Sequence, residues 1–284
     1  MIDFIKINDL KKGRILPDLL DFEIKSSERT GEVYEDRKKS AYLKNLVFTI
    51  TPGANFVKMQ GSVHCFANGG GKNNDRFTFN RFLSISEELK EYISQDDNIN
   101  VIEFGINITT PFNPSDLIKN LLASGKRQFN KKIAPGICFA EACYNQYIIK
   151  IYNKGLQQGP SDSHLLRIEV KYLKMENIFN NGLKWGDLSN PDTWVYLGKV
   201  LQKKFSEVVY YDPAIKINEI NKLDATIIKE GHNPIFWQNL SGPHASRIRK
   251  RIHTQKAIKR LCDTPSLFNN YDLVCQQKKN IANQ

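Results

Sequence analysis

Paired cysteines and long apolar runs are both missing from this 284-residue sequence. Its five cysteines are odd in number and include no CxxC pair, so that neither a disulfide framework nor a zinc site is indicated. No stretch approaches the roughly 18 to 20 apolar residues that a membrane span requires. The first seven residues lack the basic-then-apolar layout of a signal peptide and favour a strand. We therefore expect a cytoplasmic protein with reduced cysteines and no membrane partner.

Acidic residues are also fewer than basic ones. The sequence has 41 Lys and Arg residues against 30 Asp and Glu residues, which gives a formal net charge of +11 at pH 7. Such an excess is typical of proteins that bind a polyanion, and nucleic acid is the commonest one. Apolar residues make up 40% of the chain and aromatic residues 11%, which indicates a buried core and argues against a disordered chain. DNA is the partner that we expect.

Strand-like and helical segments alternate over the first 175 residues in no simple βαβ repeat. Helices are predicted at 84–94 and from Asn113-Pro114 onward. The expected fold class is therefore α+β, with a largely antiparallel sheet and flanking helices. The expected strands, each rich in Ile, Val, Phe or Tyr, are 2–7, 46–51, 54–60, 61–67, 76–80, 99–109, 146–153 and 164–173.

After about residue 175 the strand-like segments give way to mainly helical ones. Asn190-Pro191-Asp192 begins a helix whose apolar stripe continues to Val208 and Val209, and a second helix is expected at about 246–262. Prolines and glycines between 212 and 245 predict broken structure there. We expect a catalytic domain at 1–175 and a mainly helical, basic accessory module at 176–284.

Three of the expected strands carry polar residues in alternation with apolar ones. Period-2 alternation places each polar set on one face of its strand. If the strands are neighbours, that face has the residues needed for metal-assisted attack on a phosphodiester. A solvated, charged face is nevertheless ordinary in antiparallel sheets, and alternation alone does not separate the two. The polar residues are Glu103 on the first strand, Lys150, Tyr152 and Lys154 on the second, and Arg167, Glu169 and Lys171 on the third.

Five short motifs carry a resemblance to a known family, with the ordered set covering roughly residues 45–175. Their order and spacing resemble those of the replication initiators of filamentous single-stranded-DNA phages (the gene II type) and of related plasmids. The motifs are the opening Met-Ile-Asp, the Gly-Ser strand at 61–66 with the loop after it, Ile-Glu-Phe-Gly-Ile-Asn at 102–107, Ile-Tyr-Asn-Lys at 151–154 and Leu-Arg-Ile-Glu-Val at 166–170.

The resemblance implies an endonuclease fold and a site-specific enzyme that nicks and rejoins one DNA strand. Tyr152 would be the nucleophile, and it would form a 5′-phosphotyrosine that starts rolling-circle replication. Lys150 or Lys154 would favour the phenolate, and Arg167 would bind a phosphate oxygen. Origin duplex and single-stranded DNA would be the substrates, with a host helicase and polymerase as further partners.

The same resemblance implies a metal site for Mg²⁺ or Mn²⁺. Glu103 and Glu169 match the family's acidic positions. The chain lacks the paired His-hydrophobic-His motif of the wider endonuclease class, because His64-Cys65-Phe66 supplies only half of it. His64 is either a third ligand or a hydrogen-bonded structural histidine.

Two further segments are candidates for DNA contact. The loop 69–75 is not a phosphate cradle of the Walker type, since no GK[ST] follows, and we expect Lys72 to touch DNA. No acidic residue occurs between 247 and 262, where seven cations indicate a phosphate-binding helix, although a solvated basic face is the alternative. These cations are Arg247, Arg249, Lys250, Arg251, Lys256, Lys259 and Arg260.

Two other functions fit the same residues. The chain could be a non-catalytic, DNA-binding regulator on a similar fold, or a nuclease that uses water on the same metal without a covalent step. The nicking enzyme requires that Tyr152, Glu103 and Glu169 act together, and the regulator does not.

Overall fold

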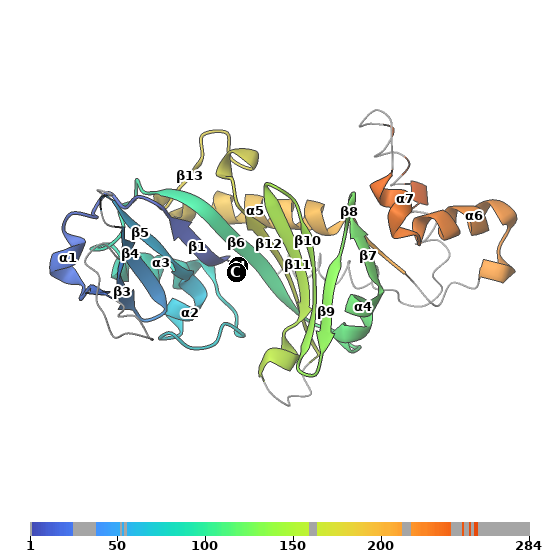
Figure 1. Cartoon of the computed structure of the whole chain (residues 1–284), viewed down its shortest axis with the longest axis horizontal. Helices are drawn as coiled ribbons and strands as arrows, with labels where there is room; N and C mark the ends of the chain where they lie inside the picture. The colour runs from blue at the N-terminus through green and yellow to red at the C-terminus, as the bar shows by residue number, and fades with distance from the viewer. Residues whose placement is uncertain are drawn as a thin grey trace. The chain divides into compact units, whose positions relative to one another are not determined.

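The structure is a computed structural model of the whole chain (Figure 1). It describes residues 2–24, 38–51, 53, 56–158, 164–211 and 217–239, together with 246, 250, 253 and 254. The chain divides into two compact units. The first unit comprises residues 1–106, 145–147 and 169–201, and the second comprises 107–144, 148–168 and 202–284.

The first unit contains an antiparallel sheet. Its strands follow the order β2-β3-β4-β5-β1-β6-β12, in which β6 and β12 also have residues in the second unit. Buried side chains such as Ile5, Phe48, Met59 and Ile102 form its core. The strands are β1 (Ile2–Ile7), β2 (Glu23–Ile24), β3 (Lys39–Leu43), β4 (Leu46–Ile50), β5 (Val57–Ser62), β6 (Asn98–Thr109) and β12 (Leu165–Tyr172), and the short β13 (Leu183–Lys184) pairs with β6.

Helices flank this sheet, and α2 packs against β1 and α3. They are α1 (Leu16–Leu19), α2 (Val63–Ala67), α3 (Phe79–Glu88) and α5 (Pro191–Phe205), with 3₁₀ turns at Met175–Asn177 and Gly186–Ser189. The start of α5 is as predicted, because the side chain of Asn190 accepts a hydrogen bond from the backbone N–H of Asp192 at 2.9 Å.

The structure corrects three of the expected elements in this unit. The strand expected at 61–67 ends at Ser62, where the side chain of Ser62 accepts from the N–H of Cys65 at 3.0 Å and begins α2. The strand expected at 76–80 is wrong as well, because Thr78 caps α3 in the same way. The helix expected at 84–94 therefore begins earlier and ends at Glu88. In each case a local cap outweighs the β-forming composition.

The second unit contains strands in the order β12-β11-β10-β9 and a three-stranded sheet in the order β14-β7-β8. The strands β7, β8, β9 and β10 were not expected from the sequence, and the helix predicted from Asn113 ends at Asn120, before β7. Asn113 caps α4 as predicted, accepting from the N–H of Ser115 at 3.0 Å. The elements are α4 (Pro114–Asn120), β7 (Leu121–Ser124), β8 (Arg127–Gln128), β9 (Asn130–Ala134), β10 (Ile137–Cys143), β11 (Tyr147–Asn153), a 3₁₀ turn (Gly155–Gln158), β14 (Val208–Tyr210), a 3₁₀ turn (Ile217–Glu219), α6 (Lys222–Gly231) and α7 (Pro234–Gln238).

The predicted α+β class, with a largely antiparallel sheet and flanking helices, is confirmed. Val208 and Val209, expected to continue the helix from Asn190, lie in β14 instead. The segment expected to be broken holds two short helices, α6 and α7, within its described part. The division into domains at residue 175 stays a prediction. No helix in the part of the chain that the structure describes is long and apolar enough to cross a membrane.

Candidate functional site

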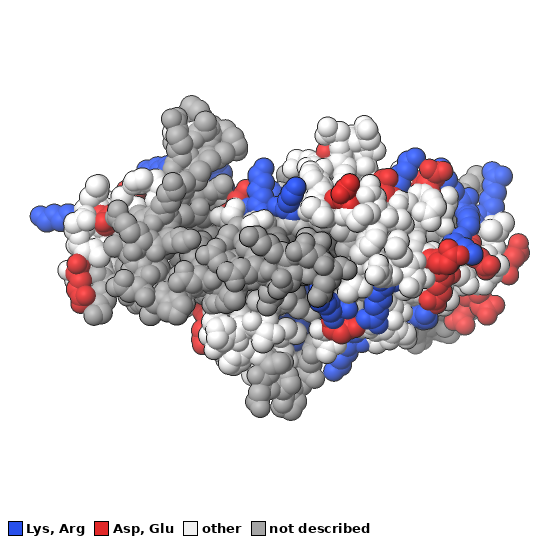
Figure 2. Space-filling model, turned by 180° about the vertical axis from the view of Figure 1, so that it is seen from behind, with Lys and Arg blue, Asp and Glu red and all other residues white. Residues whose placement is uncertain are grey.

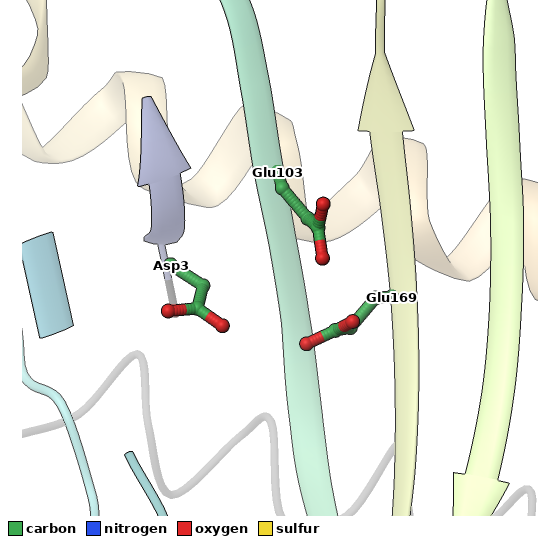
Figure 3. A group of neighbouring side chains, drawn as sticks. All are labelled: Asp3, Glu103 and Glu169. Carbon is green, nitrogen blue, oxygen red and sulfur yellow. The ribbon is translucent and has the colours of Figure 1, made fainter. Parts of the chain in front are cut away.

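Three carboxylates from separate strands converge in the first unit (Figure 3). They are Asp3 on β1, Glu103 on β6 and Glu169 on β12, and we call them the acidic triad. One carboxylate oxygen of each residue lies within 4.8 Å of the others. All three are buried, with exposed fractions of 6%, 7% and 1%. The structure thus brings Glu103 and Glu169 together, as the sequence led us to expect, and adds Asp3.

A β-bulge accounts for the place of Asp3 in the triad. On β6, Phe104 lies opposite Ile2 and Glu103 lies opposite Phe4, so that Asp3 is the extra residue between two successive pairs. A bulge bends its strand and changes the direction of the side chain there. Simple alternation would have placed Asp3 on the core face with Ile5. The pairing register instead lets it join Glu103.

Two neighbouring side chains fix the Asp3 carboxylate. Ser62 donates a hydrogen bond from Oγ to Oδ1 of Asp3. Asn73 donates from Nδ2 to Oδ2 of Asp3 at 2.7 Å. Each carboxylate oxygen has more than one lone pair, so both contacts leave acceptor capacity for a further ligand. Asp3 is therefore oriented by the end of β5 and by the loop after α2.

The donor set of the triad fits a hard divalent cation. Carboxylate oxygens are the ligands that Mg²⁺, Mn²⁺ and Ca²⁺ prefer. Oxygens bound to one such ion at about 2.0–2.6 Å lie up to roughly 4–5 Å apart. The three carboxylate oxygens of the triad lie within 4.8 Å of one another, which agrees with this range. Lys171 Nζ lies 3.7 Å from Oε2 of Glu103 and brings positive charge to the triad. Buried carboxylates are stabilised by a cation, and the triad could hold one.

His64 lies in α2 and is fully buried. Its Nε2 atom lies 2.6 Å from Oδ1 of Asp75, and its ring centroid lies 5.0 Å from that of Phe77. The contact with Asp75 is the one that a structural histidine would make. His64 is not a member of the triad, and its role as a metal ligand stays a prediction.

Asp75 connects the loop after α2 to the adjacent helices. Besides His64, its carboxylate accepts from Nδ2 of Asn68 at 2.8 Å and from Nη1 of Arg81. Arg81 also donates to the carbonyl oxygen of Ala67 at 3.1 Å. Burial raises the pKa of Asp75, but hydrogen bonds from Asn68, Arg81 and His64 outweigh it and lower this pKa to about 2. The loop that carries Asn73 to Asp3 is therefore anchored by an ionised carboxylate.

The predicted nucleophile lies in the second unit. Tyr152 is on β11, is 8% exposed, and lies opposite Phe139 of β10, with 6.3 Å between the ring centroids. Lys154 Nζ lies 5.8 Å from the centroid of the Tyr152 ring. Lys150 shares the face of Tyr152 and lies opposite Glu141. The structure therefore gives Tyr152 one lysine near its ring and a second one two residues away on the same face.

Arg167 of β12 is fully buried. The N–H of Lys154 donates to the carbonyl oxygen of Leu165 at 2.8 Å. This hydrogen bond joins the residue that follows β11 to the first residue of β12, the strand beside β11 in the sheet. Arg167 and Tyr152 belong to the second unit and the acidic triad to the first.

The basic segment predicted to bind DNA lies mostly outside the described residues. Of its seven cations only Lys250 is described, and its Nζ lies 3.9 Å from Oε2 of Glu230 and 4.8 Å from the ring centroid of Phe236. Lys72 is exposed in the loop after α2. Among the described residues on the face shown in Figure 2, basic and acidic side chains lie near one another. DNA binding by these residues stays a prediction.

The sequence analysis missed Asp3, Ser62 and Asn73. Asp3 is a single acidic residue in an apolar strand, which is the signal that identified Glu103 and Glu169. Asp3 was included in the opening Met-Ile-Asp motif of the sequence analysis but was given no role of its own. The link of Ser62 and Asn73 to the triad is a hydrogen bond from each side chain to Asp3, which the sequence does not reveal.

Comparison with solved structures finds a distant similarity. No family model matches the chain, and no curated protein matches it either. A solved structure of a rolling circle replication initiator protein from Geobacillus stearothermophilus is similar with a TM-score of 0.44 and 10% identity, over 76% of this chain and 88% of that chain. At this TM-score and identity the similarity is too distant to indicate a shared activity.

Proposed function

We propose that this chain is a site-specific, metal-dependent enzyme that nicks and rejoins one DNA strand and so initiates rolling-circle replication. The observation that carries the proposal is the buried acidic triad, whose oxygen ligands suit Mg²⁺ or Mn²⁺. Two of its members, Glu103 and Glu169, lie at the positions that the resemblance to phage and plasmid initiators assigns to metal ligands. The positive net charge of +11 supports a DNA substrate.

The chemistry is a transesterification at one phosphodiester. A divalent cation, when bound, would neutralise charge on the scissile phosphate. Tyr152 forms a bond from its phenolic oxygen to phosphorus, and the bond from phosphorus to the 3′ oxygen breaks. The phenolic proton is lost to solvent, and the departing 3′ oxygen takes up a proton to become the hydroxyl that primes synthesis. The product is a 5′-phosphotyrosine.

The residues around Tyr152 have distinct tasks in this scheme. A tyrosine has an ordinary pKa of about 10 and is a weak nucleophile at neutral pH. Positive charge from Lys150 and Lys154 favours the phenolate. Arg167 binds a phosphate oxygen through its guanidinium. In the reverse reaction a 3′-hydroxyl attacks the phosphotyrosine, frees Tyr152 and restores the phosphodiester, which closes a circle.

The deciding experiment is a search for the covalent adduct. The full chain is incubated with circular DNA that contains its origin and with Mg²⁺ or Mn²⁺, and protein bound to a labelled 5′ end is separated under denaturing conditions. Wild-type protein should form the adduct and Tyr152→Phe should not. Tyr147→Phe is a matched control, because Tyr147 lies on the same strand and is also 8% exposed. A host helicase would then unwind the duplex, and a host polymerase would extend the 3′ end.

The other functions give different results in this assay. A nuclease that activates water would nick DNA without an adduct, and Tyr152→Phe would nick at the wild-type rate. A non-catalytic DNA-binding protein would bind the origin and leave it intact with either metal. Each of these results would overturn the proposed function.

A further inference from the structure

The face of the sheet that carries Tyr152 continues over two neighbouring strands of the second unit. Figure 1 shows β11, β10 and β9 side by side. Tyr152 lies opposite Phe139 on β10, and Phe139 lies opposite Lys132 on β9. Directly opposite residues in antiparallel strands share a face. Tyr152, Phe139 and Lys132 therefore form one row across three strands, which we call the aromatic row.

The opposite face of these strands belongs to the core. Cys138 and Ala140 of β10 and Ile151 of β11 are all buried. On that side, Lys131 Nζ donates to the carbonyl oxygen of Lys119 at the end of α4, at 2.6 Å. Lys131 and Lys132 are consecutive residues of one strand and so point to opposite faces. Only Lys132 belongs to the aromatic row.

The aromatic row becomes more exposed toward β9. Tyr152 is buried, Phe139 is half-buried and Lys132 is exposed. All residues from 130 to 137 are exposed, and β9 ends the order β12-β11-β10-β9. A half-buried phenyl ring between a buried tyrosine and an exposed lysine differs from the mixed polar side chains of an ordinary solvated face.

The charge of this face is positive. Within β9, β10 and β11, Glu141 is the acidic residue, and it lies opposite Lys150 on one side and Asn130 on the other. Opposite charges at directly paired positions attract each other. Glu141 therefore has Lys150 as its directly paired neighbour on β11, and Lys132 is the cation at the exposed end of the aromatic row.

We propose that the aromatic row is a subsite for single-stranded DNA, with a base stacked on Phe139 and a phosphate bound by Lys132. The inference rests on the proposed function, because it takes Tyr152 as the position of the scissile phosphate. Tyr152 and Lys132 are two strand spacings apart, about 10 Å, which a few nucleotides of a single strand span. Stacking on Phe139 requires an unstacked base, which single strands supply and duplexes do not.

The test measures affinity for a short fluorescent oligothymidylate, with the full chain in the Tyr152→Phe background and with EDTA, so that cleavage plays no part. Phe139→Leu should weaken binding by at least about 5-fold, since base stacking on an aromatic side chain has an effect of this size or more. Phe139→Tyr, which keeps the aromatic face, should bind nearly as well as the parent. Thermal unfolding of each variant checks that the fold is intact.

A second measurement, the salt dependence of binding, tests Lys132 and uses its neighbour Lys131 as the control. Lys132→Gln should reduce the slope of log affinity against log salt by roughly 0.7, the value for one phosphate contact on a single strand. Lys131→Gln removes the same charge from the opposite face of β9 and should leave the slope unchanged. Equal changes in both variants would mean general attraction to a polyanion and would overturn the subsite.

Failure of the subsite and failure of the proposed function give different results. If wild-type protein forms the covalent adduct but Phe139→Leu binds oligothymidylate as tightly as the parent, the subsite is wrong and the nicking activity stands. If binding depends on Phe139 but no adduct forms, the subsite stands and the proposed function is wrong. Absence of any binding to oligothymidylate by the parent also overturns the subsite.

Discussion

The side-chain amide of Asn73 donates a hydrogen bond to Oδ2 of Asp3, with 2.7 Å between the two atoms. The residues are 70 positions apart in the sequence. Asn73 lies in the glycine-rich loop after α2, and Asp3 lies on the first strand. Together with Ser62, which donates to the other oxygen, Asn73 holds the Asp3 carboxylate toward Glu103 and Glu169.

Asn73→Ala should therefore weaken metal binding without removing a ligand. Groups that orient ligands typically contribute about 10- to 100-fold to metal affinity. Calorimetric titration of the purified chain with Mn²⁺ measures the loss of affinity. Asn74→Ala, one position further along the same loop, is the control and should bind Mn²⁺ nearly as well as wild type. Equal affinities in Asn73→Ala and wild type would show that the hydrogen bond does not orient a ligand.

The acidic triad should connect thermal stability to divalent cations. A ligand that binds only the folded state raises the unfolding temperature as its concentration increases. Mn²⁺ or Mg²⁺ should raise the unfolding temperature of wild-type protein, and chelation should reverse this. Glu169→Gln keeps the size of the side chain but removes one charge, so the variant should respond much less. Glu87→Gln on the surface of α3 is the control, and an identical response in all three proteins would contradict a metal at the triad.

Asp75 should make folding dependent on pH under acidic conditions. Burial raises its pKa, but hydrogen bonds from Asn68, Arg81 and His64 lower it from 3.8 to about 2 in the folded chain. A lowered pKa means that the ionised group stabilises the folded state above the unfolded value, and that this contribution is lost as pH falls toward the folded value. Between pH 3.8 and about 2, wild type should therefore lose more unfolding free energy than Asp75→Asn. Urea unfolding at several pH values measures the difference, and parallel curves would contradict it.

The basic segment at 247–260 should supply affinity for DNA rather than chemistry. Each phosphate contact on duplex DNA adds roughly 0.9 to the salt slope. Replacing Arg249, Lys250 and Arg251 with glutamine should flatten the slope by about 2 to 3 units and weaken binding to all sequences. Cleavage of a single-stranded oligonucleotide at saturating concentration should persist. An unchanged slope would mean that these charges are only solvated.

Local capping signals in the sequence predicted some elements and not others. Asn113 and Asn190 are followed by proline, and both begin helices as expected, because the cap and the proline need only neighbouring residues. Ser62 and Thr78 are also caps, but they follow segments rich in strand-forming residues. Their hydrogen bonds do not stand out in the sequence, so α2 and the start of α3 became evident only in the structure.

Alternation along single strands placed Glu103, Tyr152, Arg167 and Glu169 on the polar faces of their strands, because the face of a residue within a strand depends only on its neighbours in sequence. The resemblance to phage and plasmid initiators then assigned them their roles. Pairing between strands decided the rest. Asp3 joins the triad because β1 and β6 pair with a bulge, and Phe139 lies beside Tyr152 because β10 and β11 pair in one register. Register arises from contacts between residues far apart in the sequence, since shifting a strand by one residue reverses all its faces. The sequence thus determined which residues could act, and tertiary pairing determined which of them meet.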